Sequence, residues 1–451
     1  MLEYQQKNEG KEFCMSSNSP TVGIYTLGCK VNQYESEAIG ELFEQKGFRV
    51  TPPTAINDVY LINTCTVTAE SDRKARNFIR RAIRQNPNAI VLVTGCYSQV
   101  APHQVAAIRG VHYVCGNADK KSVVDAAVDL LARAERPTDA HLHITPPDIS
   151  GFEAMTITRF DRTRAYVKIE DGCENRCAYC IIPSARGSVR SKPAADVLNE
   201  VKILTENGCR EVVLTGIETA SYGKDLPDCT LADLLEQVDR IPNIGRVRLS
   251  SLDPSLMREA FVARIAALPS LAPHFHLSMQ SGSDSVLARM RRKYNTRMAL
   301  EGIARLRRMI PNVQITTDMI TGFPGETDAE FAETLAFVRQ AEFLTIHVFP
   351  YSRRAGTLAD SMPDQVPEPI KAARAAALSA LQGDIRKSIL DRQTNRVTEV
   401  LFETYKKAVA CGHTADFIEA ACPSPVPLHA ETRRVRITGN DGVRCMGEIL
   451  D

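Results

Sequence analysis

The sequence predicts an α/β protein in three parts: an N-terminal parallel-sheet α/β domain, a central partial (β/α)6 barrel and a small C-terminal β-barrel. Three observations support this architecture. Strand-length apolar runs alternate with helix-length segments in two successive regions, a Pro-containing stretch separates those regions, and short strands broken by turn residues fill the tail. At 451 residues the chain also exceeds what one hydrophobic core holds.

The N-terminal domain is expected over residues 21–136. Its strand-like runs are Val22–Leu27, Val59–Asn63 and Ile90–Thr94, and its helix-like stretches are Tyr34–Lys46, Glu70–Gln85 and Asp119–Arg133. Strands joined by helical crossovers form a parallel sheet. The polar residues 1–20 are expected to be a disordered extension, and residues 137–163, which contain Pro137, Pro146 and Pro147, a linker.

The central region is expected over residues 164–392 and the tail over residues 393–451. Six strand-like runs predict the partial barrel: Ala165–Ile169, Glu211–Leu214, Arg246–Leu249, Phe275–Ser278, Val313–Met319 and Leu344–Phe349. Helical stretches separate them, and a long helix, Glu368–Arg392, follows. In the tail, Val397–Phe402, Asp416–Ala420, Arg434–Ile437 and Gly447–Leu450 predict a small β-barrel.

Composition limits where the protein works and what it binds. No apolar run reaches the roughly 20 residues that a membrane helix needs, and the N-terminus carries no apolar signal core, so we expect a cytoplasmic protein with no membrane partner. Thirteen cysteines in a reducing compartment favour metal binding or catalysis over disulfides. The net charge is only +1, so a nucleic-acid surface would require local clusters of basic residues.

One cysteine motif has the spacing of an iron–sulfur site. Cys173, Cys177 and Cys180 form a C-x3-C-x2-C loop directly after the first strand of the central region, at the strand end where α/β barrels place their chemistry. Three thiolates can hold three irons of a cubane cluster and leave the fourth iron open for a small ligand such as S-adenosylmethionine (SAM). A structural zinc site, the alternative, favours paired CxxC arms, and here no second arm follows. Tyr179 would pack either on an adenine ring or within the loop.

Three further cysteines follow different strands of the N-terminal domain. Cys29, Cys65 and Cys96 each stand just past the end of a strand-like run. In a parallel sheet these ends lie on one edge, so the three thiols could converge on a second cluster. The alternative is that they are buried small hydrophobic residues. The remaining cysteines show no such arrangement, although Cys115 also follows a strand.

These motifs resemble the methylthiotransferase family of radical SAM enzymes along nearly the whole chain from Thr21. The similar segments begin with Thr26–Ser36, Asn63–Val67, Thr94–Cys96 and Asp171–Pro183, and continue with Ser250–Pro254, Gln280–Asp284, Thr321–Thr327 and His347–Ser352. The resemblance implies a radical SAM barrel and a C-terminal TRAM domain that binds RNA. It also implies two 4Fe–4S clusters, an auxiliary one on Cys29, Cys65 and Cys96 and a SAM-cleaving one on the catalytic Cys173, Cys177 and Cys180.

The same resemblance suggests which residues contact SAM. They are Tyr179, Thr215, Gly216, Glu218, Ser250, Gln280, Asp318 and Phe349. The segment Thr215–Thr219 departs from the expected pattern, because Glu218 stands where a His or Asn is expected. Glu218 would bind the SAM amino group or be a polar loop residue.

The form Gly28-Cys29-Lys30-Val31-Asn32-Gln33 resembles the branch that acts on N6-threonylcarbamoyladenosine at position 37 of tRNA. The implied reaction uses two SAM molecules: one methylates a sulfur on the auxiliary cluster, and cleavage of the other removes hydrogen from adenine C2. The rivals are the same chemistry on isopentenyladenosine or a ribosomal-protein aspartate, and a non-catalytic iron–sulfur redox sensor. The implied partners are the tRNA anticodon stem-loop and a low-potential electron donor of flavodoxin or ferredoxin type, and the protein is expected to be a monomer.

Basic residues cluster in three places that could contact RNA phosphates. The first group is Arg73, Lys74, Arg76, Arg80, Arg81 and Arg84, and the second is Arg289, Arg291, Arg292, Lys293 and Arg297. The third, Arg186, Arg190 and Lys192, follows the cysteine loop and is the expected substrate contact. Each group could instead be a solvated surface. From Val397 onward the tail has six Lys or Arg against eight Asp or Glu, which is acidic for an RNA-binding domain.

Overall fold

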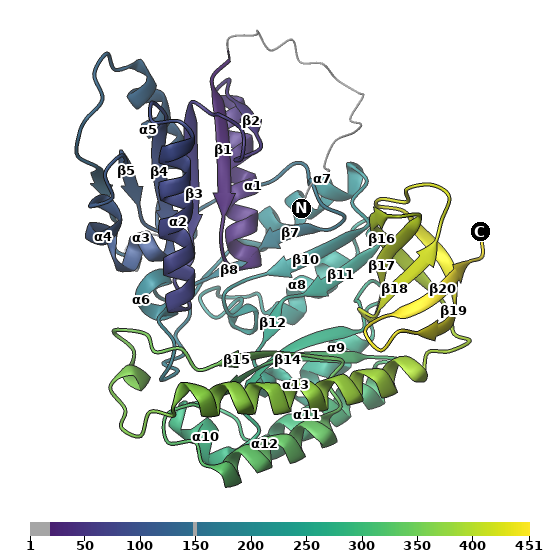
Figure 1. Ribbon diagram of the computed structural model, residues 1–451. Coiled ribbons are helices and arrows are strands. Elements are labelled where there is room, and N and C mark those ends of the chain that lie inside the picture. The colour runs from purple at the N-terminus through teal and green to yellow at the C-terminus, as the bar shows by residue number, and fades with distance from the viewer. Residues whose placement is uncertain (1–18, 148–150) are drawn as a thin grey trace.

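A computed structural model describes residues 19–147 and 151–451 (Figure 1). The expected disordered extension therefore lies outside the described residues, apart from Ser19 and Pro20. Among the helices of the described ranges, none is both long enough and apolar enough to span a bilayer.

The N-terminal domain is one six-stranded parallel sheet with the order β2-β1-β3-β4-β5-β6. The strands are β1 (Thr21–Thr26), β2 (Arg49–Thr51), β3 (Val59–Thr64), β4 (Ile90–Gly95), β5 (Tyr113–Cys115) and β6 (His141–His143). The helices are α1 (Lys30–Gln45), α2 (Ala69–Gln85), α3 (Cys96–Val100), α4 (Pro102–Ala106) and α5 (Ser122–Ala132). Strands β1, β3 and β4 are neighbours in the centre of the sheet. The three cysteines that follow them therefore leave the sheet side by side.

Successive residues of β3 point to opposite faces of this sheet, and helices cover both faces. Val59 and Leu61 pack with residues of α1 and α5, whereas Tyr60 and Ile62 pack with residues of α2 and α4. Every residue of β3 is buried, as expected for a parallel strand covered on both sides. Strands β2, β5 and β6 are only three residues long, too short to give a clear apolar pattern.

The segment predicted as a linker is partly built into the fold. Strand β6 lies inside it and pairs in parallel with β5, and Met155 and Ile157 join the main hydrophobic core. Proline residues on both sides of β6 give the segment the composition of a linker. In addition, a strand of three residues at the edge of a sheet leaves too little periodic signal to be predicted.

The central region contains seven parallel strands in two adjoining sheets, β11-β10-β7 and β12-β13-β14-β15, and only one residue separates β11 from β12. Their bounds are β7 (Ala165–Lys168), β10 (Glu211–Thr215), β11 (Arg246–Leu249), β12 (Ser251–Leu252), β13 (His274–Gln280), β14 (Gln314–Thr321) and β15 (Thr345–Pro350). A small hairpin, β8 (Glu170–Asp171) with β9 (Arg190–Ser191), frames the cysteine loop. The bridge between Val247 and Leu271 links the two sheets. This arrangement confirms the predicted partial α/β barrel.

Helices surround the outer face of the central strands (Figure 1). They are α7 (Ala194–Glu206), α8 (Leu231–Asp239), α9 (Glu259–Ala266), α10 (Asp284–Arg289), α11 (Thr296–Met309), α12 (Asp328–Ala341) and α13 (Glu368–Asp391). The short helix α6 (Ile182–Arg186) instead contacts α3 of the N-terminal domain. The outward residues of β13, Phe275, Leu277 and Met279, are fully buried in the core. The alternate residues His276, Ser278 and Gln280 are only partly buried. The inner face of the barrel is therefore polar and accessible.

The tail forms a closed five-stranded barrel with the order β16-β17-β18-β20-β19. Its strands are β16 (Val397–Lys406), β17 (Val409–Thr414), β18 (Glu419–Pro423), β19 (Thr432–Asn440) and β20 (Cys445–Ile449). The small β-barrel is confirmed, but its strand β17 was not among the predicted strands. Its ACGHT stretch carries small residues in place of the bulky apolar side chains that mark a strand.

This C-terminal barrel packs against the amino-terminal ends of the central strands (Figure 1). The ring of Phe417 stacks on His274, the first residue of β13, with ring centroids 4.4 Å apart. The Arg248 guanidinium lies 4.8 Å from the centroid of the Phe417 ring, and Arg248 also donates to the Ala415 carbonyl. The amino-terminal end of the barrel is thus closed by the tail, and the carboxyl-terminal end faces the N-terminal domain.

Candidate active site

The C-x3-C-x2-C loop is held in a fixed backbone conformation beside the carboxyl ends of the central strands. Gly172 has φ +86°, and a Cβ at this position would lie 1.9 Å from the Ser188 carbonyl oxygen. The Cys173 amide donates to the Gly187 carbonyl at 2.9 Å, and the Cys180 amide donates to the Cys177 carbonyl at 3.0 Å. The loop is therefore preorganised by the β8–β9 hairpin.

The three thiols of this loop interact electrostatically with one another. Burial, with a smaller contribution from the neighbouring thiols, raises the pKa of Cys173 and that of Cys180 to about 12. The Arg292 guanidinium lies 3.1 Å from the Cys177 Sγ. Iron displaces the thiol protons when it binds, and an adjacent guanidinium offsets the negative charge of the resulting thiolates. The residues present fit an iron–sulfur cluster.

The second set of thiols converges as the sheet topology predicts. Cys29 is the N-cap of α1, Cys65 follows β3, and Cys96 begins α3 directly after β4. Gly28 packs so closely that a Cβ there would lie 3.0 Å from the Cys65 Sγ. Burial first, and then the thiols of Cys96 and Cys29, raise the pKa of Cys65 to about 12. This trio also fits a cluster held by three thiolates.

Cys115, the other cysteine that follows a strand, is part of the sheet. It is the last residue of β5, is fully buried, and its Sγ donates to the Asp119 carbonyl at 3.0 Å. It therefore has a structural partner of its own.

The basic residues predicted to contact substrate lie elsewhere than expected. Arg186 is fully buried and pairs with Glu35 and Asp171 at 3.0 and 2.9 Å. Lys192 is 2% exposed and pairs with Glu200. Protein carboxylates thus already pair with both charges out of solvent, and neither charge is presented on the surface. Arg190 is also turned inward, and its Nη2 donates to the Arg186 carbonyl at 2.8 Å.

The positions predicted to contact SAM lie along the inner face of the barrel or just beyond its strand ends. Thr215 ends β10, Gly216 packs on Glu170, and Ser250 follows β11. Gln280, Asp318 and Phe349 are on the accessible face of β13, β14 and β15, where Phe349 is 47% exposed. Tyr179 packs partly buried against a small apolar cluster that includes Phe323 and Tyr351.

Glu218 lines a cavity of about 340 Å³ beside the cysteine loop. Asn175, from the loop, and Asp253 and Lys293 line the same cavity. Burial, and then Asp253, raise the pKa of Glu218 to about 7. A cavity beside the cysteine loop that carries these charged and polar side chains could accommodate the polar end of a small ligand.

Sequence reasoning assigned Arg292 to a basic surface group, but the structure buries it at the cysteine loop. Besides Cys177, it contacts Asp253 at 3.0 Å and the Ser278 carbonyl at 3.1 Å. Asp253 and Asn175 were also missed as site residues, although both stand in segments that the resemblance covers. Spacing along the chain gave no sign that a residue 115 positions beyond Cys177 would contact it.

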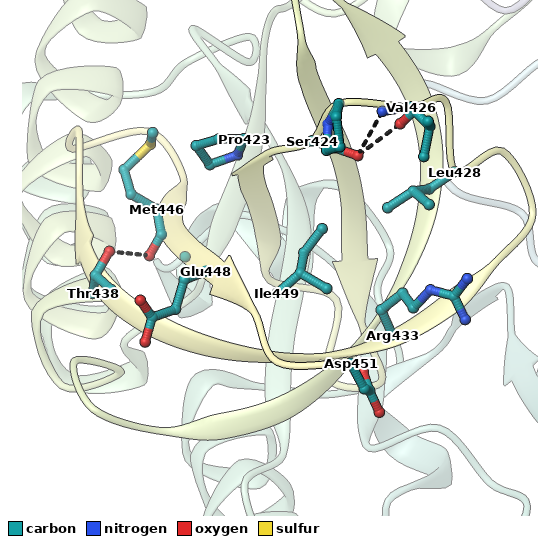
Figure 2. A pocket seen from close by; sticks show the side chains of 12 residues that line it. Pro423, Ser424, Val426, Leu428, Arg433, Thr438, Met446, Glu448, Ile449 and Asp451 are labelled. Atoms are coloured by element: carbon teal, nitrogen blue, oxygen red, sulfur yellow. Dashed lines mark hydrogen bonds between the residues drawn. The ribbon is translucent and has the colours of Figure 1, made fainter.

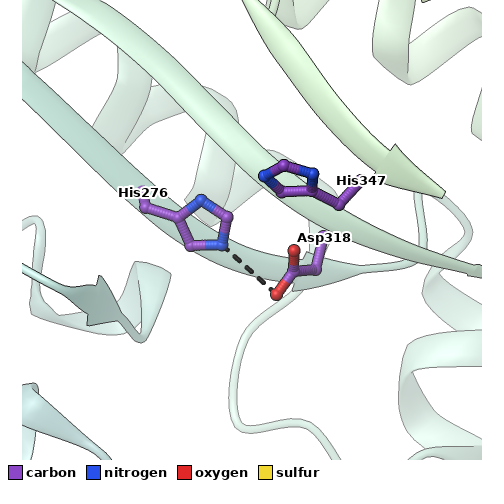
Figure 3. A group of neighbouring side chains, drawn as sticks. All are labelled: His276, Asp318 and His347. Carbon is purple, nitrogen blue, oxygen red and sulfur yellow. Dashed lines mark ion pairs between the residues drawn. The ribbon is translucent and has the colours of Figure 1, made fainter. Parts of the chain in front are cut away.

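A group outside both trios lies deeper on the inner face. His276, Asp318 and His347 come from β13, β14 and β15 and point toward one another (Figure 3). The His276 Nε2 lies 3.2 Å from an Asp318 carboxylate oxygen.

A separate cavity of about 720 Å³ lies entirely on the C-terminal barrel (Figure 2). Its walls include Leu428, Met446 and Ile449, and all its lining residues fall within residues 423–451. It includes neither cysteine trio, so we do not assign it to the active site.

Comparisons with known proteins agree with this arrangement. A family model described as the Radical SAM superfamily matches residues 167–338, and one described as Uncharacterized protein family UPF0004 matches residues 21–116. The solved structure of the radical S-adenosylmethionine methyltransferase TsrM from Kitasatospora setae has a TM-score of 0.55 and 15% identity. That match covers 76% of this chain and 77% of TsrM and shows the shared fold.

Curated relatives are similar over nearly the full length. Threonylcarbamoyladenosine tRNA methylthiotransferase MtaB of Bacillus subtilis is 38% identical over 92% of this chain and 93% of its own. The protein of that name from Thermotoga maritima is 38% identical over 96% and 98%. A tRNA-2-methylthio-N(6)-dimethylallyladenosine synthase from Syntrophobacter fumaroxidans is 34% identical over 95% of each chain. With two convergent cysteine trios on this fold and relatives of this similarity, the chain belongs to the methylthiotransferase family of radical SAM enzymes.

Proposed function

We propose that this protein transfers a methylthio group to adenine C2 of N6-threonylcarbamoyladenosine at position 37 of tRNA. The observation that carries the proposal is the pair of cysteine trios, one at the carboxyl ends of the N-terminal sheet and one at the carboxyl ends of the central strands. The more similar relatives are named for this substrate. A base flipped out of the anticodon loop would lie between the two trios.

The proposed cofactors are two 4Fe–4S clusters and SAM, which together supply a radical that activates the C–H bond and a sulfur that carries the methyl group. Cys173, Cys177 and Cys180 would hold one cluster, and Cys29, Cys65 and Cys96 the other. Arg292 places a positive charge beside the trio of Cys173, Cys177 and Cys180, because its guanidinium lies 3.1 Å from the Cys177 Sγ.

Glu218 and Asn175 are the proposed contacts for the polar end of SAM. Both line the cavity beside the loop, and their side chains lie 3.5 Å apart. The Glu218 amide is fixed by donation to the Glu170 carboxylate at 2.8 Å. A carboxylate at this place could accept hydrogen bonds from an ammonium group.

The proposed macromolecular partner is the tRNA anticodon stem-loop, and a low-potential flavodoxin or ferredoxin would supply electrons to a monomeric enzyme. A basic surface on α2 is the proposed RNA contact. Arg76, Arg80 and Arg84 line one cavity of about 740 Å³ with Arg109.

A second candidate substrate is the dimethylallyl form of the same adenosine, because relatives named for it are 34% identical to this chain. Nucleoside mass spectrometry separates the two substrates. Reduced, cluster-loaded protein is incubated with SAM and with stem-loop RNAs that carry either modification. The expected result is a methylthio product from the threonylcarbamoyl RNA and none with the Cys177→Ala variant. A product from the dimethylallyl RNA alone would reject the proposed substrate, and SAM-independent RNA binding with no product would favour a redox sensor.

A further inference from the structure

The inner face of the central barrel carries one concentrated group of polar side chains below the cysteine loop. Asp318 and His347 stand directly opposite each other in the register of β14 and β15, and His276 comes from the neighbouring strand β13 (Figure 3). One nitrogen or oxygen atom from each of the three side chains lies within 4.8 Å of the other two. Since His276 and Asp318 are only partly buried and His347 is exposed, a ligand can reach this group.

One histidine of this group has a fixed orientation. The His276 Nδ1 lies 2.9 Å from the Thr316 hydroxyl, and its Nε2 lies 3.2 Å from the Asp318 carboxylate. The other carboxylate oxygen of Asp318 makes no hydrogen bond to a side chain within the described part of the protein. The group therefore offers one hydrogen-bond acceptor and a ring nitrogen of His347.

A cation from the N-terminal domain is electrostatically coupled to the same group. Lys30 is exposed and directly follows Cys29, and it interacts electrostatically with Asp318 and with His347. Arg248 also lies near Lys30, but its charge is paired with Glu211 at 2.7 Å. Lys30 thus adds a positive charge within electrostatic range of this group, and it directly follows a ligand of the proposed auxiliary cluster.

We propose that Lys30, His347 and the His276–Asp318 pair form the site that binds the threonylcarbamoyl substituent of the substrate base. This inference rests on the proposed function. The substituent ends in an amino-acid carboxylate and also carries a hydroxyl and N–H donors. Lys30 and His347 would bind the carboxylate, and Asp318 would accept from the hydroxyl or an N–H. An apolar dimethylallyl group would leave Lys30 and Asp318 without partners. Because the bound base would also exclude water from these two side chains, their lost hydrogen bonds would weaken binding.

The location agrees with the chemistry that the base must undergo. Lys30 is covalently next to Cys29 of one trio, and Asp318 and His347 lie on strands whose carboxyl ends lead toward the other trio. A substituent bound between these groups would hold its adenine between the two proposed clusters. The site would therefore position the base as well as select it.

The test uses cluster-loaded enzyme and three otherwise identical stem-loop RNAs. One carries threonylcarbamoyladenosine, one carries its neutral carboxamide, and one carries unmodified adenosine. Dissociation constants come from fluorescence anisotropy, and kcat/KM comes from mass spectrometry of the methylthio product. The variants are Lys30→Gln, Lys30→Arg and His347→Phe, and the matched control is Lys202→Gln, an exposed lysine on α7. Iron and sulfide content is measured for each variant.

The wild type should prefer the carboxylate over the carboxamide by roughly ten- to a hundredfold, the range that a charge-assisted hydrogen bond supports. Lys30→Gln should remove this preference while binding the carboxamide RNA as the wild type does, and Lys30→Arg should restore part of it. His347→Phe should reduce the preference, and Lys202→Gln should leave it intact.

Each contrary result is distinguishable. A wild type that does not modify the threonylcarbamoyl RNA would reject the proposed function itself. If the wild type modifies it but Lys30→Gln keeps the full preference, or weakens binding of all three RNAs equally, only the recognition site is rejected. A stoichiometric zinc ion that is lost in His347→Phe would show that a metal occupies the group instead.

Discussion

Glu35 of α1 and Arg186 of α6 form an ion pair in which neither side chain is exposed to solvent, with an Nη1–Oε1 distance of 3.0 Å. The pair is 151 residues apart in the chain and joins the N-terminal domain to the segment that follows the cysteine loop. Lys120 and Lys168 also contact Glu35, and Asp171 contacts Arg186. One buried charge network therefore fixes the two cysteine trios relative to each other.

Replacing Glu35 with alanine should destabilise the protein by about 3–5 kcal/mol, because three buried cations would lose their shared carboxylate. Burial opposes the charge on Glu35, but Arg186 and then Lys120 hold its pKa well below the ordinary range. Urea unfolding followed by far-UV circular dichroism measures the change. The control is Glu70→Ala, which removes an exposed carboxylate that pairs with Arg73 on the same helix and should change little. An equal effect of both variants would contradict the role of the network.

The two cysteine trios should lose iron independently. Cys65→Ala and Cys177→Ala should each lower the iron content of anaerobically reconstituted protein from about eight to about four atoms per chain, since each trio would hold one 4Fe–4S cluster. Iron and acid-labile sulfide assays measure the loss. Cys209→Ala is the control, because Cys209 is buried and its Sγ donates to the Glu211 carbonyl at 3.2 Å. Wild-type protein with a single cluster would refute the assignment.

Sequence reasoning worked where local pattern determines structure. The central strands were predicted within a few residues, and the topology of a parallel sheet brought Cys29, Cys65 and Cys96 to one edge. The prediction failed where a charged side chain pairs with a residue that is far away in the sequence. Arg186 and Arg292 were predicted to contact RNA because few acidic residues lie near them in the sequence. Arg186 instead pairs with Glu35, 151 residues away, and Arg292 contacts Cys177, 115 residues away. Only the tertiary fold identifies such pairs.

The contact between the C-terminal barrel and the central strands should weaken in acid. Glu211 is fully buried and contacts Arg164 and Arg248, while Arg164 also pairs with Glu403 of β16. Burial alone would raise the pKa of Glu211, but Arg248 and Arg164 lower it to about 2. A depressed carboxyl pKa stabilises the fold above the unfolded-state pKa of about 4.3, and this contribution is lost as the pH falls toward 2.

Glu211→Gln should therefore be less stable than the wild type by roughly 3 kcal/mol at neutral pH, and the difference should shrink between about pH 5 and pH 2. Urea unfolding across this range tests the prediction. Glu399→Gln is the control, because Glu399 is 65% exposed and lies 3.7 Å from Arg246 of the same cluster. A difference that is independent of pH would show that the loss comes from packing.

The exposed face of α2 should contribute to RNA binding through charge alone. Asp72 of this helix is buried against Arg354, so its carboxylate does not offset the outward charges of Arg80 and Arg84. Replacing both arginines with glutamine should weaken binding of the anticodon stem-loop. The slope of log Kd against log salt concentration should fall by roughly 0.7 for each phosphate contact that is lost. Fluorescence anisotropy at several salt concentrations measures both. Arg73→Gln, which removes a cation paired with Glu70, should have a smaller effect. An unchanged salt slope in the double variant would place the RNA on another surface.

Gly172 should be essential for the SAM-cleaving site although it carries no reactive group. Its φ of +86° is unfavourable for other residues, and an added Cβ would lie 1.9 Å from the Ser188 carbonyl oxygen. The backbone would have to move, which would break the hydrogen bond from the Cys173 amide to Gly187 and misplace the first thiol of the loop. Gly172→Ala should therefore retain about four irons, those of the other trio.

The matched control is Gly383→Ala in the exposed middle of α13, where nothing lies within 4 Å of an added Cβ. Alanine favours a helix, so this variant should keep both clusters and unfold at an equal or higher temperature than the wild type. Electron paramagnetic resonance of the reduced proteins distinguishes the two clusters. If Gly172→Ala kept the SAM-dependent signal, the loop would tolerate a shift of its first cysteine, and the conformation at Gly172 would not be what positions the trio.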